Sequence, residues 1–230
     1  MTLTAEELSV LALSLKVGLW AVAVSLPPAI AAAYVLARKR FAGKALFDAA
    51  VHLPLVLPPV VVGFLLLELF GRRGPIGALL EPLGLVFAFR WTGAALAAAI
   101  MGFPLMVRAI RLSIQAVDTR IELAARTLGA SPARVFFTIT LPLAWPGLVT
   151  GGILAFARAL GEFGATITFV SNIPGETQTL PLAIYSFTQT PGHDDQVLRL
   201  SLLAVALSIA ALALSEWLVR RSGATEAAHA

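Results

Sequence analysis

Residues 117–142 read VDTRIELAARTLGASPARVFFTITLP, and this polar stretch separates two long apolar segments. Its apolar residues recur at helical spacing and predict one narrow stripe along a short helix. They are Val117, Ile121, Ala124, Ala125 and Leu128. Gly129 is well placed to end that helix, and Ser131-Pro132 is typical of an N-cap followed by a first helical residue. The stretch therefore predicts a helix, a tight turn and a second helix.

A second face of the same helix carries charge. Asp118, Glu122 and Arg126 lie four residues apart, and this spacing places Glu122 to pair with Arg126. A short amphipathic helix of this kind either lies on the lipid surface or docks into a groove of a partner protein. The stripe is narrow and partly made of alanine, which suits a close-packed protein groove better than lipid.

The composition of the whole chain excludes an ordinary water-soluble enzyme. Of its 230 residues, 58% are hydrophobic and only 13% are charged, whereas soluble domains carry about 25% charged residues. A membrane crossing needs about 20 apolar residues, so five crossings with short loops occupy nearly the whole chain. The chain has no cysteine, which excludes disulfides, thiolate metal sites and cysteine nucleophiles.

Uncharged runs of spanning length predict an all-α membrane protein with five transmembrane helices. We expect them at residues 12–37, 51–70, 91–112, 142–170 and 198–219, within one membrane domain that covers 12–221. The stretch 172–197 has loop composition. Its piece 180–187 is predicted either as a short helix that dips into the membrane or as a sixth crossing.

Basic residues predict the orientation in the membrane. The loops 38–50 and 108–141 and the C-terminal end hold most of the Lys and Arg of a chain whose net charge is +4. By the positive-inside rule these three regions are cytoplasmic. Residues 1–11 are then a periplasmic N-terminus and residues 222–230 a short cytoplasmic tail. Because the basic residues are explained by topology, no nucleic-acid partner is expected.

The loop at residues 113–141 resembles the cytoplasmic "EAA" coupling loop of the binding-protein-dependent ABC importer permeases. That loop has Glu-Ala-Ala, three residues, Gly, nine residues and Ile-x-Leu-Pro, which matches Ala124-Ala125, Gly129 and the segment 139–142. This chain has Leu123 at the position of the motif's Glu, and its acid is Glu122 instead. In the family, this loop seats in a cleft of the ATPase subunit. The resemblance thus implies ATPase docking by Ile121, Glu122, Ala124, Ala125, Arg126, Leu128, Gly129 and Ser131.

Further segments are similar to the molybdate branch of that family. They are HLPLVLPPVVVG (52–63), GRRG (71–74), FPLMVRAIR (103–111), ARALGEFGATITFVSN (157–172) and IPGET (173–177). The sulfate permeases share ALGEFG, so sulfate or another oxyanion is the alternative cargo, and tungstate is not separated from molybdate. The resemblance implies a homodimer in the bacterial inner membrane, with the transport path on the two-fold axis. It also implies an extracytoplasmic molybdate-binding protein as a partner.

No Walker A motif, G-x-x-x-x-G-K-[ST], occurs in the sequence. The chain is therefore expected not to be an enzyme and to bind no cofactor, while ATP and Mg²⁺ are used by a partner ATPase. An intramembrane enzyme is the remote alternative, but the sequence has no HExxH motif and no catalytic residue or metal site is expected. A channel would have no need of the docking loop.

Two charges inside a predicted helix mark a candidate transport path. Arg158 and Glu162 lie four residues apart in an apolar segment, where they form either a structural pair or a pair that lines the path. The other path or gate candidates are Pro58, Thr166, Ser171 and Asn172. Small residues also recur every four positions, at Gly147, Gly151, Ala155 and Ala159, and predict close helix packing within the subunit or across the dimer. Arg72-Arg73 is either a solvated turn or a contact with the binding protein.

Overall fold

The computed structural model describes residues 3–227, and these residues form helices and loops without a strand. The elements are α1 (Ala5–Arg38), α2 (Lys44–Val56), α3 (Pro59–Phe70), α4 (Pro75–Leu80), the 3₁₀ turn η1 (Glu81–Leu83), α5 (Trp91–Ala116), α6 (Thr119–Thr127), α7 (Pro132–Val135), the π-helix η2 (Phe136–Thr140), α8 (Leu141–Leu143), α9 (Trp145–Leu160), α10 (Gly164–Val170), α11 (Leu180–Thr188) and α12 (Asp194–Ala227).

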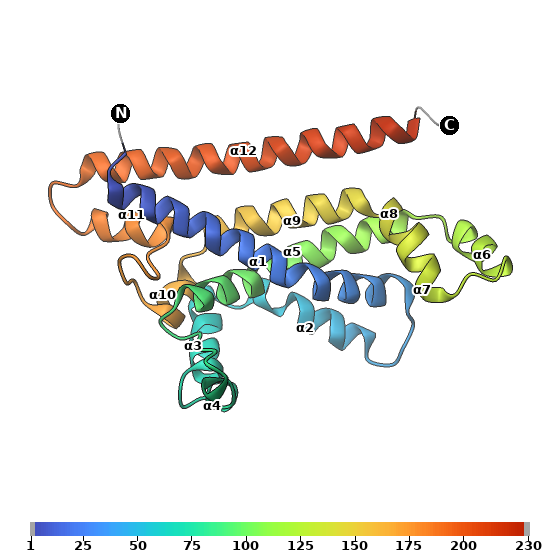
Figure 1. The fold of residues 1–230 in the computed structure, drawn as a ribbon, viewed down its shortest axis with the longest axis horizontal. Coiled ribbons are helices and arrows are strands. Elements are labelled where there is room, and N and C mark those ends of the chain that lie inside the picture. Colours follow the sequence, from blue (N-terminus) through green and yellow to red (C-terminus); the bar gives the residue numbers. More distant parts are fainter. Residues whose placement is uncertain (1–2, 228–230) are drawn as a thin grey trace.

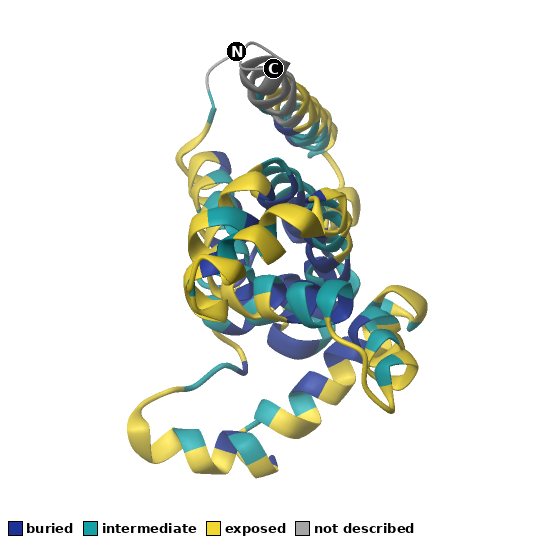
Figure 2. Ribbon diagram, turned by 90° about the vertical axis from the view of Figure 1, so that its right-hand side faces the viewer, coloured by how far each residue is buried: buried dark blue, intermediate teal, exposed yellow. Residues whose placement is uncertain are grey.

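Helices α1, α5 and α9 form the central bundle (Figure 1), and α2 packs on α5. Helix α12 lies along one side of the bundle against α9 and α11, while α3 and α4 project from the opposite side. Helices α6 and α7 lie at the end of the molecule remote from α10 and α11. Buried residues concentrate in the bundle, and α12 is largely exposed where its burial is described (Figure 2).

The bundle is held by small residues that let helix backbones approach closely. Gly147 packs against Ser113, Gly151 against Met106, and Ala155 against Gly102, so this row of α9 faces α5 of the same chain. Such small-residue contacts are the usual means of packing helices in lipid, where no hydrophobic effect drives the helices together. The sequence left open whether this row packs within the subunit or across the dimer. The structure shows that Gly147, Gly151 and Ala155 pack within the subunit.

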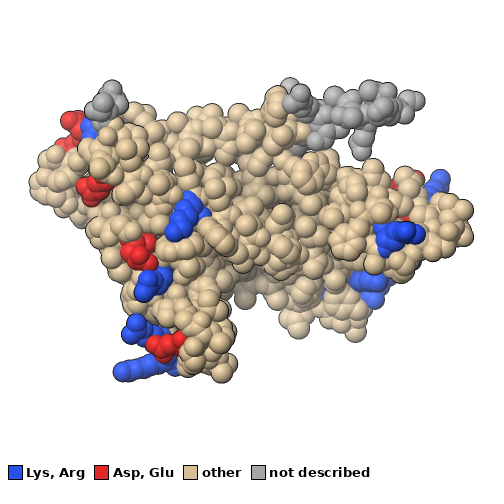
Figure 3. Space-filling model, in the orientation of Figure 1, with Lys and Arg blue, Asp and Glu red and all other residues tan. Residues whose placement is uncertain are grey.

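The predicted all-α membrane class is confirmed by length and apolarity. Among the described residues, three helices are long and apolar enough to cross a membrane, or up to five if each of two bent pairs is one span. Charged side chains gather toward the two ends of the visible face, with an almost uncharged stretch between them (Figure 3). This distribution suits a bundle whose middle lies in hydrocarbon.

Two predicted helices are broken. Residues 51–70 were expected as one helix, but the chain bends by 111° between α2 and α3. Leu57 is extended (φ −69°, ψ 141°) because it precedes Pro58. Residues 142–170 were also expected as one helix, but α8 leads into α9 through a 67° bend that follows Leu143. Helix α9 then ends at Leu160, and α10 begins at Gly164.

The outer helices are longer than predicted. Helix α1 begins at Ala5 rather than residue 12, because Thr4 and Glu7 form a capping box. Helix α12 begins at Asp194 rather than residue 198 and continues through 222–227, which were expected as a tail; residues 1–2 and 228–230 lie outside the described residues. Within 172–197, α11 supplies the predicted short helix.

Candidate functional site

The loop between α5 and α9 folds as a helix, a turn and a second helix. Asp118 caps α6 by accepting a hydrogen bond from the amide of Arg120 (2.8 Å). Gly129 has φ +87°, its amide donates to Arg126 O (3.0 Å), and the amide of Ala130 donates to Ala125 O (3.1 Å). These two bonds form a Schellman motif, which requires a residue in the left-handed conformation.

Helix α6 presents an apolar face to its surroundings. Leu128 is 89% exposed and Ile121 is 49% exposed, and Ala124 on the same face is exposed as well. Ala125 is half-buried, and Arg126, Gly129 and Ser131 are exposed. The predicted stripe is wrong at Val117, which is buried and ends α5. Since no residue of α6 is buried, the helix is a protruding surface rather than part of the core.

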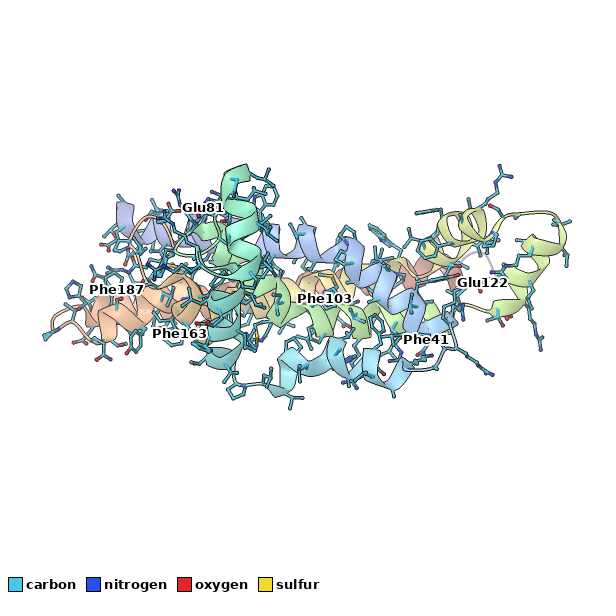
Figure 4. The ribbon with its side chains drawn as sticks, turned by 90° about the horizontal axis from the view of Figure 1, so that it is seen from below. Phe41, Glu81, Phe103, Glu122, Phe163 and Phe187 are labelled. Carbon is cyan, nitrogen blue, oxygen red and sulfur yellow. The ribbon has the colours of Figure 1, made fainter. Side chains whose placement is uncertain are left out.

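Glu122 does not lie on this exposed face. Its Oε1 lies 3.1 Å from Nη2 of Arg38 in α1 and accepts a hydrogen bond from Oγ1 of Thr140 in η2 (2.7 Å). The predicted pair of Glu122 with Arg126 is therefore wrong. Figure 4 shows Glu122 between the bundle and the tip of the loop. One residue along a helix corresponds to a rotation of about 100°, so moving the acid from 123 to 122 turns it to another face.

The break between α9 and α10 is built around Glu162. The Glu162 carboxylate is buried, its Oε2 lies 2.6 Å from Nη1 of Arg158, and its Oε1 accepts a hydrogen bond from the amide of Ala165 (2.8 Å). That amide lies in the first turn of α10, where unpaired N–H groups and the helix dipole favour a carboxylate. The predicted pairing of Arg158 and Glu162 is present, although they stand across a helix end rather than within one helix.

The bend of α2–α3 and the break of α9–α10 meet in space. Pro58 caps α3, and the next residue, Pro59, packs against Gly164 at the start of α10. Further along, Gly63 of α3 packs on the backbone of Ala165. Thr166 is buried at 2% exposure. The structure thus brings Pro58, Glu162 and Thr166 to one region of the bundle.

Ser171 and Asn172 follow the end of α10. Ser171 has φ +63° and ψ −163°, a region that is essentially restricted to glycine. Nδ2 of Asn172 donates to Oγ of Ser186 in α11 (2.6 Å). These two residues therefore join α10 to α11, at the other end of α10 from Glu162.

Beside the α9–α10 break lies a hollow of about 470 Å³. Phe163 (Figure 4) and Tyr185 lie on its wall with their rings 5.2 Å apart, and apolar residues of α12 contribute to it. The hollow is also lined by Thr188 and Ser208, whose hydroxyls donate to carbonyls of their own helices.

Sequence reasoning missed several polar contacts that join distant segments. Arg38 and Thr140 hold Glu122. Oε1 of Glu7 in α1 lies 2.9 Å from Nη2 of Arg199 in α12. Oγ of Ser14 accepts a hydrogen bond from the amide of Leu180 (2.7 Å). Of these contacts, only that of Glu122 was indicated by the sequence. The indication is that the acid stands one residue before the position of the glutamate in the EAA motif.

Comparison with known proteins agrees with the resemblance to importer permeases. Residues 29–223 match the family described as "Binding-protein-dependent transport system inner membrane component". The chain is 60% identical over 223 residues to the molybdenum transport system permease protein ModB of Escherichia coli (strain K12), covering 96% of this chain and 97% of that protein. It is 36% identical over 220 residues to the sulfate transport system permease protein CysW of Synechococcus elongatus, covering 94% and 76%.

A solved structure supports the fold. A chain of a bacterial ABC transporter involved in the import of the acidic polysaccharide alginate has a TM-score of 0.74 and 14% identity, covering 95% of this chain and 80% of that one. At that identity the likeness concerns the fold alone. The family match and the near full-length relatives place the present chain in the family of binding-protein-dependent transport system inner membrane components.

Proposed function

We propose that this chain is the permease subunit of an ATP-driven importer of molybdate, working as a homodimer in the bacterial inner membrane. The observation that supports molybdate as the cargo is the 60% identity to ModB across nearly the whole chain, compared with 36% identity to the sulfate permease. Tungstate has nearly the same size and charge as molybdate, so it is accepted as well. Residues 1–11 face the periplasm and the end of α12 faces the cytoplasm.

In this proposal the ATPase seats on α6 and the turn after it. The exposed side chains of Ile121 and Leu128 supply an apolar face, and Gly129 shapes the turn. The partner subunit binds the ATP and Mg²⁺, and this chain binds no cofactor. An extracytoplasmic molybdate-binding protein meets the opposite end, where Arg72, Arg73 and Arg90 line a pocket of about 460 Å³ and suit an acidic rim.

The gate is formed where the α2–α3 bend meets the α9–α10 break. Pro58, Arg158, Glu162 and Thr166 contribute to it, and Ser171 and Asn172 close its far end. Irregular backbone at membrane depth is tolerated where it is buried in protein or lines a cavity, and two such breaks packed together let one segment move against the other.

The cargo is tested by deleting the gene and measuring cellular molybdenum by mass spectrometry, at trace molybdate and ample sulfate. The strain is then supplied again with this chain, its ATPase and its binding protein. We expect molybdenum to fall on deletion and to return on resupply. Unchanged molybdenum together with impaired sulfate assimilation would instead assign the chain to sulfate.

ATPase docking is tested by co-purification with Leu128→Asp. The charge on the 89% exposed side chain should expel the ATPase without disturbing the core. Leu79→Asp is the matched control, because Leu79 is 74% exposed but belongs to α4, which projects from the bundle far from α6 (Figure 1). Retention of the ATPase by the Leu128 variant, with normal transport, would refute docking at this face.

A further inference from the structure

Helix α6 has no apolar anchor of its own. None of its residues is buried, and its main helix contacts are with α7 and η2 rather than with α1, α5 or α9. A docking helix that carries force from a partner to the membrane bundle must be rigidly joined to that bundle. The apolar core does not provide this joint, so polar contacts of α6 are the place to look for it.

Glu122 provides such a joint. Its Oε1 receives two hydrogen bonds, one from Arg38 Nη2 (3.1 Å) and one from Thr140 Oγ1 (2.7 Å). The same nitrogen of Arg38 also donates to Val117 O at the end of α5 (2.9 Å). One carboxylate thereby connects α6 to the end of α1, the end of α5 and η2, which leads into α8 and α9.

The joint is enclosed enough to be stiff. The side chains of Arg38 and Glu122 are 14% and 13% exposed, and Thr140 is 1% exposed. Charge-assisted hydrogen bonds to an ionised carboxylate are shorter and stronger than neutral ones, and limited exposure reduces the screening that makes surface ion pairs weak. Glu122 follows Ile121 by one residue, which is about 100° around the helix, so it lies beside the apolar face formed by Ile121 and Leu128 rather than within it.

We infer that Glu122, with Arg38 and Thr140, is the joint that transmits movement of the docked α6 to α1, α5 and α9, and that Glu122 is a positioning residue rather than a contact with the ATPase. The inference rests on the proposed function and assigns one of the predicted docking residues a different role. Docking and transmission are thereby divided between two faces of one short helix.

The experiment uses the purified complex of this chain, its ATPase and its binding protein in proteoliposomes. Three quantities are measured: ATPase retained per permease, ATP hydrolysed, and molybdate taken up. The variants are Glu122→Gln, Arg38→Met and the milder Thr140→Val. Arg120→Gln is the matched control, because Arg120 is an exposed charge on the same helix and lies outside the joint.

We expect Glu122→Gln and Arg38→Met to keep the ATPase and hydrolyse ATP, while molybdate taken up per ATP falls about tenfold, a typical coupling loss. Thr140→Val should give a smaller loss, and Arg120→Gln none. The exchanged pair Arg38→Glu with Glu122→Arg restores the ion pair but loses the hydrogen bonds with Val117 and Thr140, so it should recover only part of the ratio. A merely structural role would instead lower ATPase retention and ATP hydrolysis together with uptake. If Arg38→Met does not fold, Glu122→Gln and Thr140→Val carry the test.

Two outcomes would overturn the inference. If Glu122→Gln expels the ATPase as Leu128→Asp does, Glu122 is a docking contact. If the ATPase is retained and the uptake per ATP is unchanged in Glu122→Gln, the joint does not transmit movement. Failure of the proposed function is distinguishable, because wild-type complex would then take up no molybdate or Leu128→Asp would keep its ATPase.

Discussion

Nη1 of Arg158 lies 2.6 Å from Oε2 of Glu162 across the end of α9, and the side chain of Glu162 is 1% exposed. The carboxylate also accepts a hydrogen bond from the amide of Ala165. It therefore pairs with a cation through one oxygen and caps the N-terminus of α10 through the other. The pair is therefore part of the break itself.

Removing the cation should destabilise this break strongly. Arg158→Met leaves a buried carboxylate without a counter-ion, and we expect the free energy of unfolding to fall by about 3–5 kcal/mol. The double variant Arg158→Met with Glu162→Gln should recover much of this loss, because a neutral amide oxygen still accepts from Ala165. Thermal unfolding in detergent micelles measures both. Simple addition of the two single effects would contradict the coupling.

The turn after α6 depends on backbone conformation rather than on space. A Cβ at Gly129 would meet nothing within 4 Å, but its φ is +87°. Gly129→Val should therefore distort the turn at a cost of about 1–3 kcal/mol and reduce co-purification of the ATPase. Gly129→Asn is the control, since asparagine tolerates this conformation. Equal retention of the ATPase by both variants would contradict the prediction.

The contact between α3 and α10 depends on space. A Cβ at Gly63 would lie 2.5 Å from the carbonyl oxygen of Ala165, whereas at Gly152 in α9 the nearest atom would be 3.7 Å away. Gly63→Ala should push α3 off α10 and lower the melting temperature. Gly152→Ala should leave it unchanged or raise it, because alanine favours a helix by about 1 kcal/mol over glycine. A reversed order of the two melting temperatures would refute this packing.

Backbone strain at Ser171 should be removable. Its φ of +63° and ψ of −163° cost about 1–3 kcal/mol for a residue with a Cβ. Ser171→Gly should raise the free energy of unfolding by a similar amount, measured in detergent. Ser171→Ala keeps the Cβ and only removes the hydroxyl, so it should bring no gain. An equal rise in both variants would point to the hydroxyl instead.

The sequence allowed the helix order and the α6–α7 turn to be predicted, because their causes are local. Gly129 ends α6 through its own φ, and Ser131 caps α7 through a hydroxyl that accepts from Arg134, three residues away. Glu7 and Arg199 could not be matched in this way. They stand 192 residues apart in sequence and meet only because the N-terminal parts of α1 and α12 both pack beside α11.

The candidate site was partly predictable for the same reason. The spacing of Arg158 and Glu162 indicated their contact, but it did not indicate that a helix ends between them. Pro54, Pro58 and Pro59 all lie near the α2–α3 bend. The sequence does not show which of them bends the chain, because the packing of neighbouring helices decides the position of the bend. The role of Glu122 needed Arg38, a residue from a different helix, to become visible.

The π-helix η2 (Phe136–Thr140) makes the number of residues between α7 and α9 important. Substitutions keep that number constant and so do not test it. A π turn holds one more residue than an α turn, and η2 spans residues 136–140, between Gly129 and Pro142. Because the π turn absorbs one residue, deleting a single residue there would let the segment continue as an ordinary α-helix while α7 and α9 keep their directions. Deleting a residue from the regular part of α9 would instead rotate everything before it by about 100°, so Leu128 would face a different direction with its chemistry intact.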